Sequence, residues 1–357
     1  MYLRHLKLID FKNIKEFETD FSQINCFVGN NGVGKTNMLD SIYYLSFCKS
    51  YFSPNDTSSI REGADFFAIH GDYVLKGTTE HFSCTLEADG RKQIKHSGKL
   101  YKRHSEHIGR LPSVMVAPND QSLITGGSEN RRRFVDIIVS QQDKTYLNNL
   151  IRYNKAVEQR NKLLKNYLKT RFLDETALDI WDEQAAFYGD DIRQRRREFF
   201  AGFAQPFRKY YDYVSCADEQ VGLDYRTYEG GLLDLLGRNR EKDKLTGYTT
   251  VGIHRDELEF GLNGRPIRYY GSQGQQKTFL LALKLAQFDY LYEHLGLKPL
   301  LLLDDVFDKF DFQRVSKLLQ LISQQHFGQV FLTDTHIERV ESIIADEFKD
   351  KTKIFRL

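Results

Sequence analysis

A run of eight residues near the N-terminus has the residue types and the spacing of a phosphate-binding loop. The run G-x-x-x-x-G-K-T consists of Gly29, Asn30, Asn31, Gly32, Val33, Gly34, Lys35 and Thr36. Glycines let successive backbone N–H groups surround a phosphate, and a following helix adds the positive end of its dipole. Lys35 would reach the β- and γ-phosphates, and the Thr36 hydroxyl would hold Mg²⁺. Apolar residues 24–28 precede the run and a helical pattern over 35–47 follows it, so the sequence predicts a nucleoside triphosphate site.

A pair of carboxylates far along the chain is the second candidate for the same site. Four consecutive leucines at 300–303 predict a buried parallel strand that ends at Asp304 and Asp305. Asp304 is placed to hold Mg²⁺, and Asp305 is the candidate catalytic residue that orients or deprotonates the attacking water. Both functions require this strand to share one sheet with the phosphate loop.

A third motif precedes the predicted carboxylate strand. It consists of Ser272, Gln273, Gly274 and Gln275. An amphipathic helix follows, with Phe279, Leu280 and Leu283 at helical spacing. A serine at a helix start offers a hydroxyl and free N–H groups to an anion, but an ordinary N-cap also explains Ser272. The order of the three motifs resembles that of ABC-type ATPases, in which the signature helix of one subunit caps the γ-phosphate held by another subunit.

Further segments resemble the RecF family, bacterial recombination and repair ATPases related to SMC heads. The matching segments are residues 8–13, 34–43, 127–136, 153–161, 181–184 and 254–258. The resemblance implies an α/β fold in which an ABC-type, SMC-head-like P-loop ATPase lobe carries an inserted, mainly helical second lobe. It implies ATP and Mg²⁺ as cofactors, with Lys12 and Asn13 as additional nucleotide contacts.

The same resemblance implies what the protein does with ATP. An ATP-dependent homodimer would hold DNA at single-strand–duplex junctions and gaps. Weak, DNA-stimulated hydrolysis would act as a switch that releases the DNA. Mediator proteins of the RecO and RecR type would be partners, and the biological roles would be recombinase loading, replication restart and the SOS response. The alternative is an ATP-driven motor, or another SMC-head-like ATPase that remodels DNA.

Several positions depart from the family pattern. Lys12 stands where an arginine is usual, so any nucleotide contact there would come from a point charge and not a planar fork. Asp334 occupies the position where many ABC ATPases have a switch histidine, and His336 follows it two residues later. His336 therefore remains either a γ-phosphate sensor or a helix-start residue. The run at 254–256 has either a structural role or a role at the nucleotide of a second subunit.

Composition limits the classes of partner. The chain has 357 residues, of which 28% are charged, and a formal net charge of +2. A DNA site must therefore be a local basic patch, because no global basic field exists. The four cysteines are too far apart to indicate a zinc site or a disulfide framework. No apolar stretch approaches a membrane span and no signal-peptide pattern begins the chain, so we expect a cytoplasmic protein without a membrane partner.

The order of apolar patterns predicts two lobes. We expect residues 1–118 and 296–357 to form a discontinuous ATP-binding lobe, and residues 119–295 to form the mainly helical lobe with the signature motif. Within them, the patterns predict an antiparallel meander between residues 66 and 87 and helices from about 129 to 204, with Pro206 near their end. They also predict strand-like sequence near Gly247 and a hairpin at Asn263–Gly264.

Two basic helix faces are candidate DNA contacts. Arg193, Arg196 and Arg197 lie at i, i+3 and i+4 and should share one face of a helix. Lys162 and Lys165 belong to a second basic run on the preceding helix. Such faces can bind phosphates without reading sequence, but a solvated helix surface explains either run as well. The arginines at 131–133 either line the dimer groove or brace the lobes.

Overall fold

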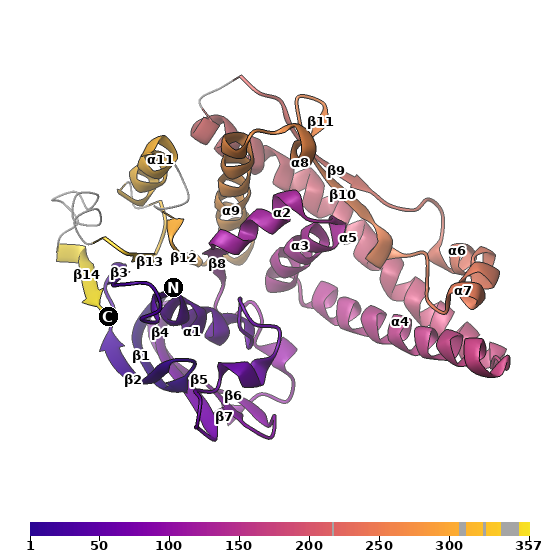
Figure 1. Ribbon diagram of the computed structural model, residues 1–357, viewed down its shortest axis with the longest axis horizontal. Coiled ribbons are helices and arrows are strands. Elements are labelled where there is room, and N and C mark those ends of the chain that lie inside the picture. Colours follow the sequence, from indigo (N-terminus) through magenta and orange to yellow (C-terminus); the bar gives the residue numbers. More distant parts are fainter. Residues whose placement is uncertain (216–217, 307–311, 324–325, 337–349) are drawn as a thin grey trace. The chain divides into compact units, whose positions relative to one another are not determined.

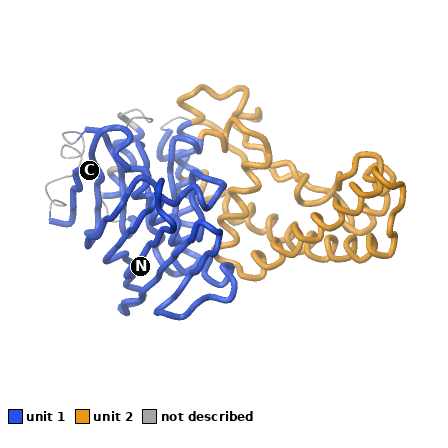
Figure 2. Tube along the Cα trace, turned by 60° about the horizontal axis from the view of Figure 1, so that its bottom comes forward, with its two compact units in different colours: residues 1–120, 210–216, 277–357 blue, residues 121–209, 217–276 orange. Residues whose placement is uncertain are grey.

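The computed structural model describes residues 1–215, 218–306, 312–323, 326–336 and 350–357 (Figure 1). The chain divides into two compact units, which Figure 2 shows in different colours. Unit 1 comprises Met1–Asp120, Tyr210–Cys216 and Lys277–Leu357, and unit 2 comprises Gln121–Lys209 and Ala217–Gln276. The second boundary lies near residue 277, whereas we expected it at residue 295. The reason is that side chains after Lys277 pack in unit 1, as Phe279 does against Tyr211.

A parallel sheet forms the centre of unit 1 and contains both candidate nucleotide motifs. Its strand order is β14–β3–β13–β12–β8, and every neighbouring pair is parallel. The strands are β3 (Ile24–Val28), β8 (Ser113–Val116), β12 (Leu300–Leu303), β13 (Val330–Asp334) and β14 (Thr352–Arg356). The residues of β3, β8, β12 and β13 are all buried, which explains why these strands read as mainly apolar runs.

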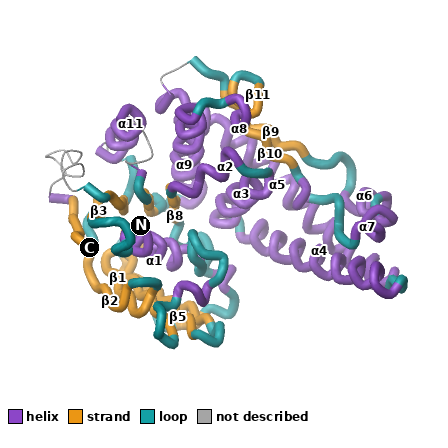
Figure 3. The backbone as a smooth tube through the Cα atoms, viewed as in Figure 1, coloured by secondary structure: helices purple, strands orange, loops and turns teal. Residues whose placement is uncertain are grey.

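An antiparallel sheet forms the other layer of unit 1 (Figure 3). Its strands, in the order β2–β1–β4–β5–β6–β7, are β2 (Ile14–Asp20), β1 (Tyr2–Phe11), β4 (Phe66–Leu75), β5 (Thr78–Glu87), β6 (Lys92–His96) and β7 (Lys99–Leu100). The pairing of β4 with β5 confirms the expected meander. Helix α1 (Lys35–Phe47) packs against strands of both sheets, and almost all of its side chains are buried. The helix that follows the phosphate loop is therefore fixed from both sides.

Unit 2 is mainly helical, as expected. Its long helices are α3 (Ser128–Gln142), α4 (Lys144–Thr170) and α5 (Glu175–Ser215), the last of which continues into unit 1. The shorter ones are α2 (Gln121–Thr125), α6 (Leu232–Arg238), α7 (Arg240–Thr246) and α8 (Ile267–Tyr270). A small antiparallel sheet contains β9 (Val221–Arg226), β10 (Glu257–Leu262) and β11 (Arg265–Pro266). The turn between β10 and β11 is the hairpin predicted at Asn263–Gly264.

Two local predictions in unit 2 are wrong. Pro206 lies inside α5 and not at its end, because the buried aromatic residues Phe203 and Phe207 hold the helix in place around it. No strand forms near Gly247. Instead α7 ends there: Gly247 has φ 75°, and its N–H donates to the carbonyl of Asp243.

The described residues of the C-terminal part of the chain include two further helices. Helix α9 (Gln273–Leu295) begins in unit 2 and runs into unit 1, and α11 (Phe312–Ser323) follows β12. Within the described ranges, no helix combines the length and the apolar character that crossing a membrane requires.

Candidate nucleotide-binding site

The phosphate loop connects β3 to α1, as the motif requires. Gly32 and Gly34 have φ of 87° and 112°, backbone conformations that L side chains rarely adopt. A Cβ atom at Gly34 would also lie 2.9 Å from the side-chain oxygen of Asn13. The Lys35 ammonium is buried, and it donates to the carbonyl oxygens of Gly29 at 2.7 Å and Asn30 at 3.0 Å. The loop is thus closed around the Lys35 ammonium.

The Asp304 carboxylate, just after β12, is hydrogen-bonded to Thr36 at the start of α1. The Thr36 hydroxyl donates to Asp304 at 2.9 Å, and the Thr333 hydroxyl at the end of β13 also lies 2.9 Å from that carboxylate. Burial, with a contribution from the neighbouring Asp305 carboxylate, raises the pKa of Asp304 to about 6. The two residues expected to hold Mg²⁺ are therefore adjacent, although 268 positions separate them in the sequence. Thr333 is a member of the site that we did not predict.

Asp305 has a strained backbone and an unused acceptor. Its φ is 46°, and its N–H donates to the Thr333 hydroxyl at 2.9 Å. Its Oδ1 atom is buried and has no hydrogen-bond partner among the described residues. A buried acceptor of this kind is costly unless another group satisfies it, so the carboxylate is suited to a ligand or a water molecule.

Lys12 and Asn13 lie beside the loop but make different contacts. Asn13 donates to the carbonyl of Gly32 at 3.2 Å and accepts from Asn37 at 2.8 Å. The Lys12 ammonium forms an ion pair of 2.6 Å with the buried carboxylate of Asp40. Asn13 therefore supports the loop directly, whereas the charge of Lys12 is committed to α1. We did not predict Asp40 as the partner of Lys12; the sequence feature that could have indicated it is its position in the helix that begins at Lys35.

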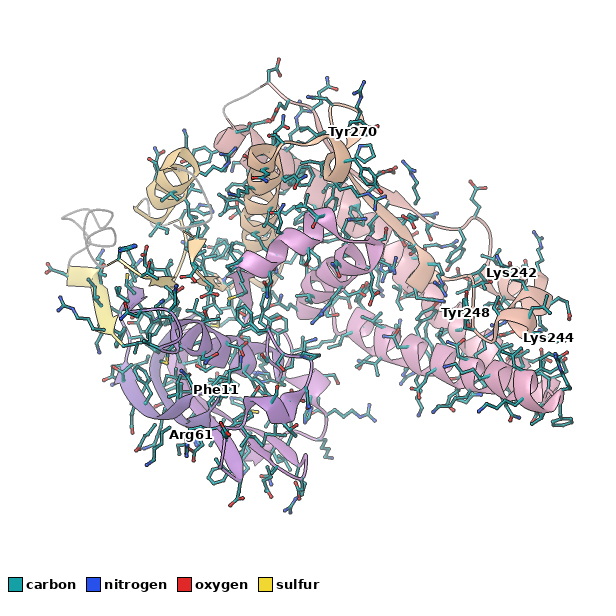
Figure 4. All side chains as sticks on the ribbon, in the orientation of Figure 1. Phe11, Arg61, Lys242, Lys244, Tyr248 and Tyr270 are labelled. Atoms are coloured by element: carbon teal, nitrogen blue, oxygen red, sulfur yellow. The ribbon has the colours of Figure 1, made fainter. Side chains whose placement is uncertain are left out.

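An open hollow in unit 1 adjoins these residues. Its lining consists of Lys12, Asn13, Ser58, Ile60, Arg61 and Glu62. Arg61, labelled in Figure 4, donates to Asp10 at 2.6 Å. We did not predict Arg61 as a site residue because it lies outside the recognised motifs.

The signature motif begins α9 with a reciprocal cap. The Ser272 hydroxyl accepts from the N–H of Gln275 at 3.2 Å, and the side-chain oxygen of Gln275 accepts from the N–H of Ser272 at 2.7 Å. The N-cap interpretation of Ser272 is therefore confirmed. Ser272 and Gln273 are nevertheless exposed, and Gly274 is half-buried. The predicted sensor His336 lies just after β13. It is exposed, and its backbone N–H donates to the Asp334 carboxylate at 2.7 Å.

The structure contradicts one of the two predicted DNA-contacting faces. Arg196 is 2% exposed, and it contacts the carboxylates of Asp136 at 2.8 Å and Asp256 at 3.1 Å. Arg193 stacks 4.3 Å from the ring centre of Tyr228 and donates to backbone carbonyls. Arg193 and Arg196 therefore pack inside unit 2, whereas Arg197 is exposed and stays a prediction for DNA contact.

The second basic run lies on the surface of α4. Lys162 is exposed and forms an ion pair of 2.7 Å with Glu158. Lys165 is exposed, and no ion pair joins it to any residue within the described ranges. This run therefore stays a prediction for DNA contact.

Other motifs have structural roles within unit 2. Arg131 is buried and donates to carbonyls of Gly126 and Leu258, so it braces one unit. Arg160 is fully buried between Asp182 at 2.5 Å and Asp243 at 2.6 Å. These ion pairs give the segments around residues 160 and 182 a structural role that requires no ligand.

His254 also has an internal role. Its Nδ1 atom lies 2.6 Å from the hydroxyl of Tyr153, and its Nε2 atom lies 3.1 Å from the carbonyl of Thr249. Burial lowers the pKa of His254 to about 4. Of the alternatives for residues 254–256, these contacts favour the structural one, because the imidazole remains neutral at physiological pH.

Comparisons with known proteins agree with these motifs. A family described as the AAA ATPase domain matches residues 1–203. The DNA replication and repair protein RecF of Bacteroides fragilis is 45% identical over 361 residues, covering 100% of this chain and 96% of the relative. The protein of the same name from Flavobacterium johnsoniae is 44% identical, with 100% of both chains covered.

Solved structures show the same relationship. A structure described as the recombination mediator protein RecF-ATP in the RecFOR pathway has a TM-score of 0.87 and 30% identity, and it covers 94% of this chain and 92% of that one. An SMC head bound to the C-winged helix domain of ScpA has a TM-score of 0.56 at 15% identity, which shows a shared fold alone. The nucleotide lobe is thus of the SMC-head type, and the chain belongs to the RecF family of DNA replication and repair proteins.

Proposed function

We propose that the protein is an ATP-operated switch that binds DNA during recombinational repair. The observation that carries the proposal is the hydrogen bond between Thr36 and Asp304, which joins the phosphate loop to the carboxylate strand. ATP is the nucleotide because the matched RecF structure with a TM-score of 0.87 is described as an ATP complex. The hollow lined by Lys12 and Arg61 offers room next to the loop for the nucleoside.

The donor set fits Mg²⁺ with the nucleotide. A hydroxyl and a carboxylate are oxygen ligands of the type that Mg²⁺ prefers. Burial raises the pKa of Asp304 to about 6, and a bound cation would favour its ionised form. When bound, Mg²⁺ neutralises charge that develops on the phosphates. Thr36 and Asp304 would hold it, directly or through water.

Asp305 is the residue that we assign to hydrolysis. Its buried Oδ1 atom can accept from a water molecule, and its backbone is held by Thr333. Water orientation by one carboxylate supports weak hydrolysis, as a switch requires. The ATP-bound state would therefore last long enough to hold DNA, and hydrolysis would release it.

A second copy of the chain would complete each nucleotide site. The exposed Ser272 at the start of a 23-residue helix offers a hydroxyl and the positive end of the helix dipole. In the ATP-bound homodimer, Ser272, Gln273, Gly274 and Gln275 would contact the γ-phosphate held by the other copy. The exposed imidazole of His336 is a candidate sensor of the same phosphate, since Asp334 accepts from the backbone N–H of His336 and not from its ring.

The DNA and the partners follow from family membership. The matched RecF structure is described as a mediator in the RecFOR pathway. We therefore assign single-strand–duplex junctions and gaps as the DNA ligand, and mediators of the RecO and RecR type as partners. Recombinase loading, replication restart and the SOS response are the corresponding roles. The exposed Lys162 and Lys165 can contact phosphates, whereas the buried Arg196 cannot.

Mass measurement with and without ATP and gapped DNA tests the switch. We expect a dimer only with ATP, and a larger ATP-dependent complex with DNA. Ser272→Arg should keep ATP affinity but lose the dimer, because a bulky cation cannot fit against a partner's nucleotide. Glu293→Arg is a matched control, since it places the same side chain at an exposed position of the same helix, away from the signature. A dimer that persists in Ser272→Arg would refute the signature assignment, and ATP-driven strand displacement would favour a motor instead.

A further inference from the structure

Basic and aromatic side chains gather at one end of unit 2. We call this surface the distal patch and define it by Lys165, Lys169, Phe172, Lys242, Tyr248 and Arg255. It joins the end of α4 to α7 and to the segment that follows α7. Lys242 and Tyr248 are labelled at this end of unit 2 in Figure 4.

Tertiary contacts hold the two segments of the distal patch side by side. Asn161 on α4 accepts from both the N–H and the hydroxyl of Thr249 at 2.7 Å. A Cβ atom at Gly247 would collide with the side chain of Leu168 and lie 3.9 Å from that of Lys165. The lysines of α4 and the residues around Tyr248 therefore form one surface, although about eighty residues separate them in the sequence.

No ion pair within the described ranges engages the cations of the distal patch. Lys165, Lys169, Lys242 and Arg255 are exposed, and none of them forms an ion pair with a residue that the structure describes. The carboxylates of Glu158, Glu175 and Glu241 near the patch are already paired with Lys162 or Lys244. The side chain of Asp174 accepts from the N–H of Ala177 at the start of α5. The surface thus attracts a polyanion.

Exposed rings lie among these cations. Phe172 is 70% exposed and Tyr248 is 43% exposed, and Leu245 beside them is 77% exposed. The Arg255 guanidinium lies 5.2 Å from the ring centre of Tyr248. Aromatic faces combined with cations are what proteins use to stack bases and neutralise phosphates of a single strand. A duplex keeps its bases stacked on each other, so the rings have no base to bind there.

We propose that the distal patch binds an unpaired DNA strand, with Phe172 and Tyr248 stacking on bases and the surrounding cations contacting phosphates. This inference rests on the proposed DNA-binding function and adds to it a place and a strand type. It also restricts Lys165 to the phosphates of a single strand, since the nearby rings require unstacked bases.

Fluorescence anisotropy with a labelled oligothymidylate and a blunt duplex of the same length tests the proposal in the presence of ATP. Combining Phe172→Ala with Tyr248→Ala should weaken single-strand binding at least about fivefold per ring. Duplex affinity should change by less than about twofold. Combining Lys165→Gln with Lys169→Gln should make the log–log salt slope for the single strand shallower by roughly 1.4.

Phe187→Ala is the matched control, because Phe187 is 72% exposed on α5 and lies outside the distal patch. Circular dichroism and ATP binding should be unchanged in every variant. Equal loss for both probes, or no loss in the double alanine variant, would overturn the stacking assignment. If the unaltered protein binds neither probe, nor a gapped duplex, with ATP, the proposed function itself fails. Binding of the gapped duplex and the blunt duplex but not of the oligothymidylate overturns only the distal patch. If the unaltered protein binds the probes and the variants have no effect on this binding, only the assignment of the distal patch is refuted.

Discussion

Arg196→Met should destabilise unit 2 without removing a DNA contact. Arg196 is 2% exposed and donates to Asp136, Asp256, the carbonyl of Ile253 and the hydroxyl of Tyr146. The methionine fills much of the space but leaves the two carboxylates without their cation. Removing one partner of a buried ion pair costs about 3 to 5 kcal/mol. That loss is a large share of the total stability of a domain, about 5 to 15 kcal/mol.

The pH dependence of the loss identifies its cause. Burial already raises the pKa of Asp256, while bonds from Thr227 and Tyr225 and the charge of Arg196 lower it. Without Arg196, the folded-state pKa should rise further above the unfolded value. A raised carboxyl pKa contributes stability that is complete below the unfolded pKa and is lost as the pH rises through the folded pKa. The destabilisation should therefore be larger at about pH 8 than at about pH 5.

Urea unfolding at both pH values, followed by circular dichroism, measures the effect. Arg197→Met is the control, because Arg197 is the exposed neighbour and its replacement should cost within about 0.5 kcal/mol. DNA affinity of the folded Arg196→Met protein should match that of the unaltered protein. An unchanged unfolding midpoint together with weaker DNA binding would refute the burial argument and restore Arg196 as a DNA contact.

Further predictions concern the nucleotide and the buried histidine. Lys35→Ala should abolish ATP binding in calorimetry, because the phosphates lose their main charge partner in the loop, and retained micromolar affinity would contradict the site. Asp305→Asn should bind ATP but hydrolyse it poorly in a phosphate-release assay, since asparagine tolerates the φ of 46° and cannot act as a base. The pKa of His254 is lowered to about 4, so stability present above about pH 6.5 should be lost as the pH falls toward 4. The loss should reach about 3 kcal/mol in unfolding experiments, and His254→Gln should flatten the dependence.

The phosphate loop and the carboxylate strand could be predicted because their signals are local. The loop needs glycines at fixed positions, and the strand at 300–303 needs an unbroken apolar run to be buried in a parallel sheet. Both motifs could be assigned to one sheet since they serve one ligand. The sequence could not predict that β13 lies between β3 and β12, or that the Thr333 hydroxyl at its end joins the site. Strand order depends on packing between distant segments.

The basic helix faces show what only the tertiary structure decided. Helical spacing correctly grouped Arg193 with Arg196, but the same spacing describes a solvated face and a buried one. Arg196 is buried because Asp136 and Asp256 come from other segments to pair with it, whereas Lys165 on α4 is exposed. The sequence by itself determined the family, the nucleotide motifs and the long helices, since each depends on residues close in the chain. Which charges face solvent depends on contacts between distant segments, and these exist only after folding.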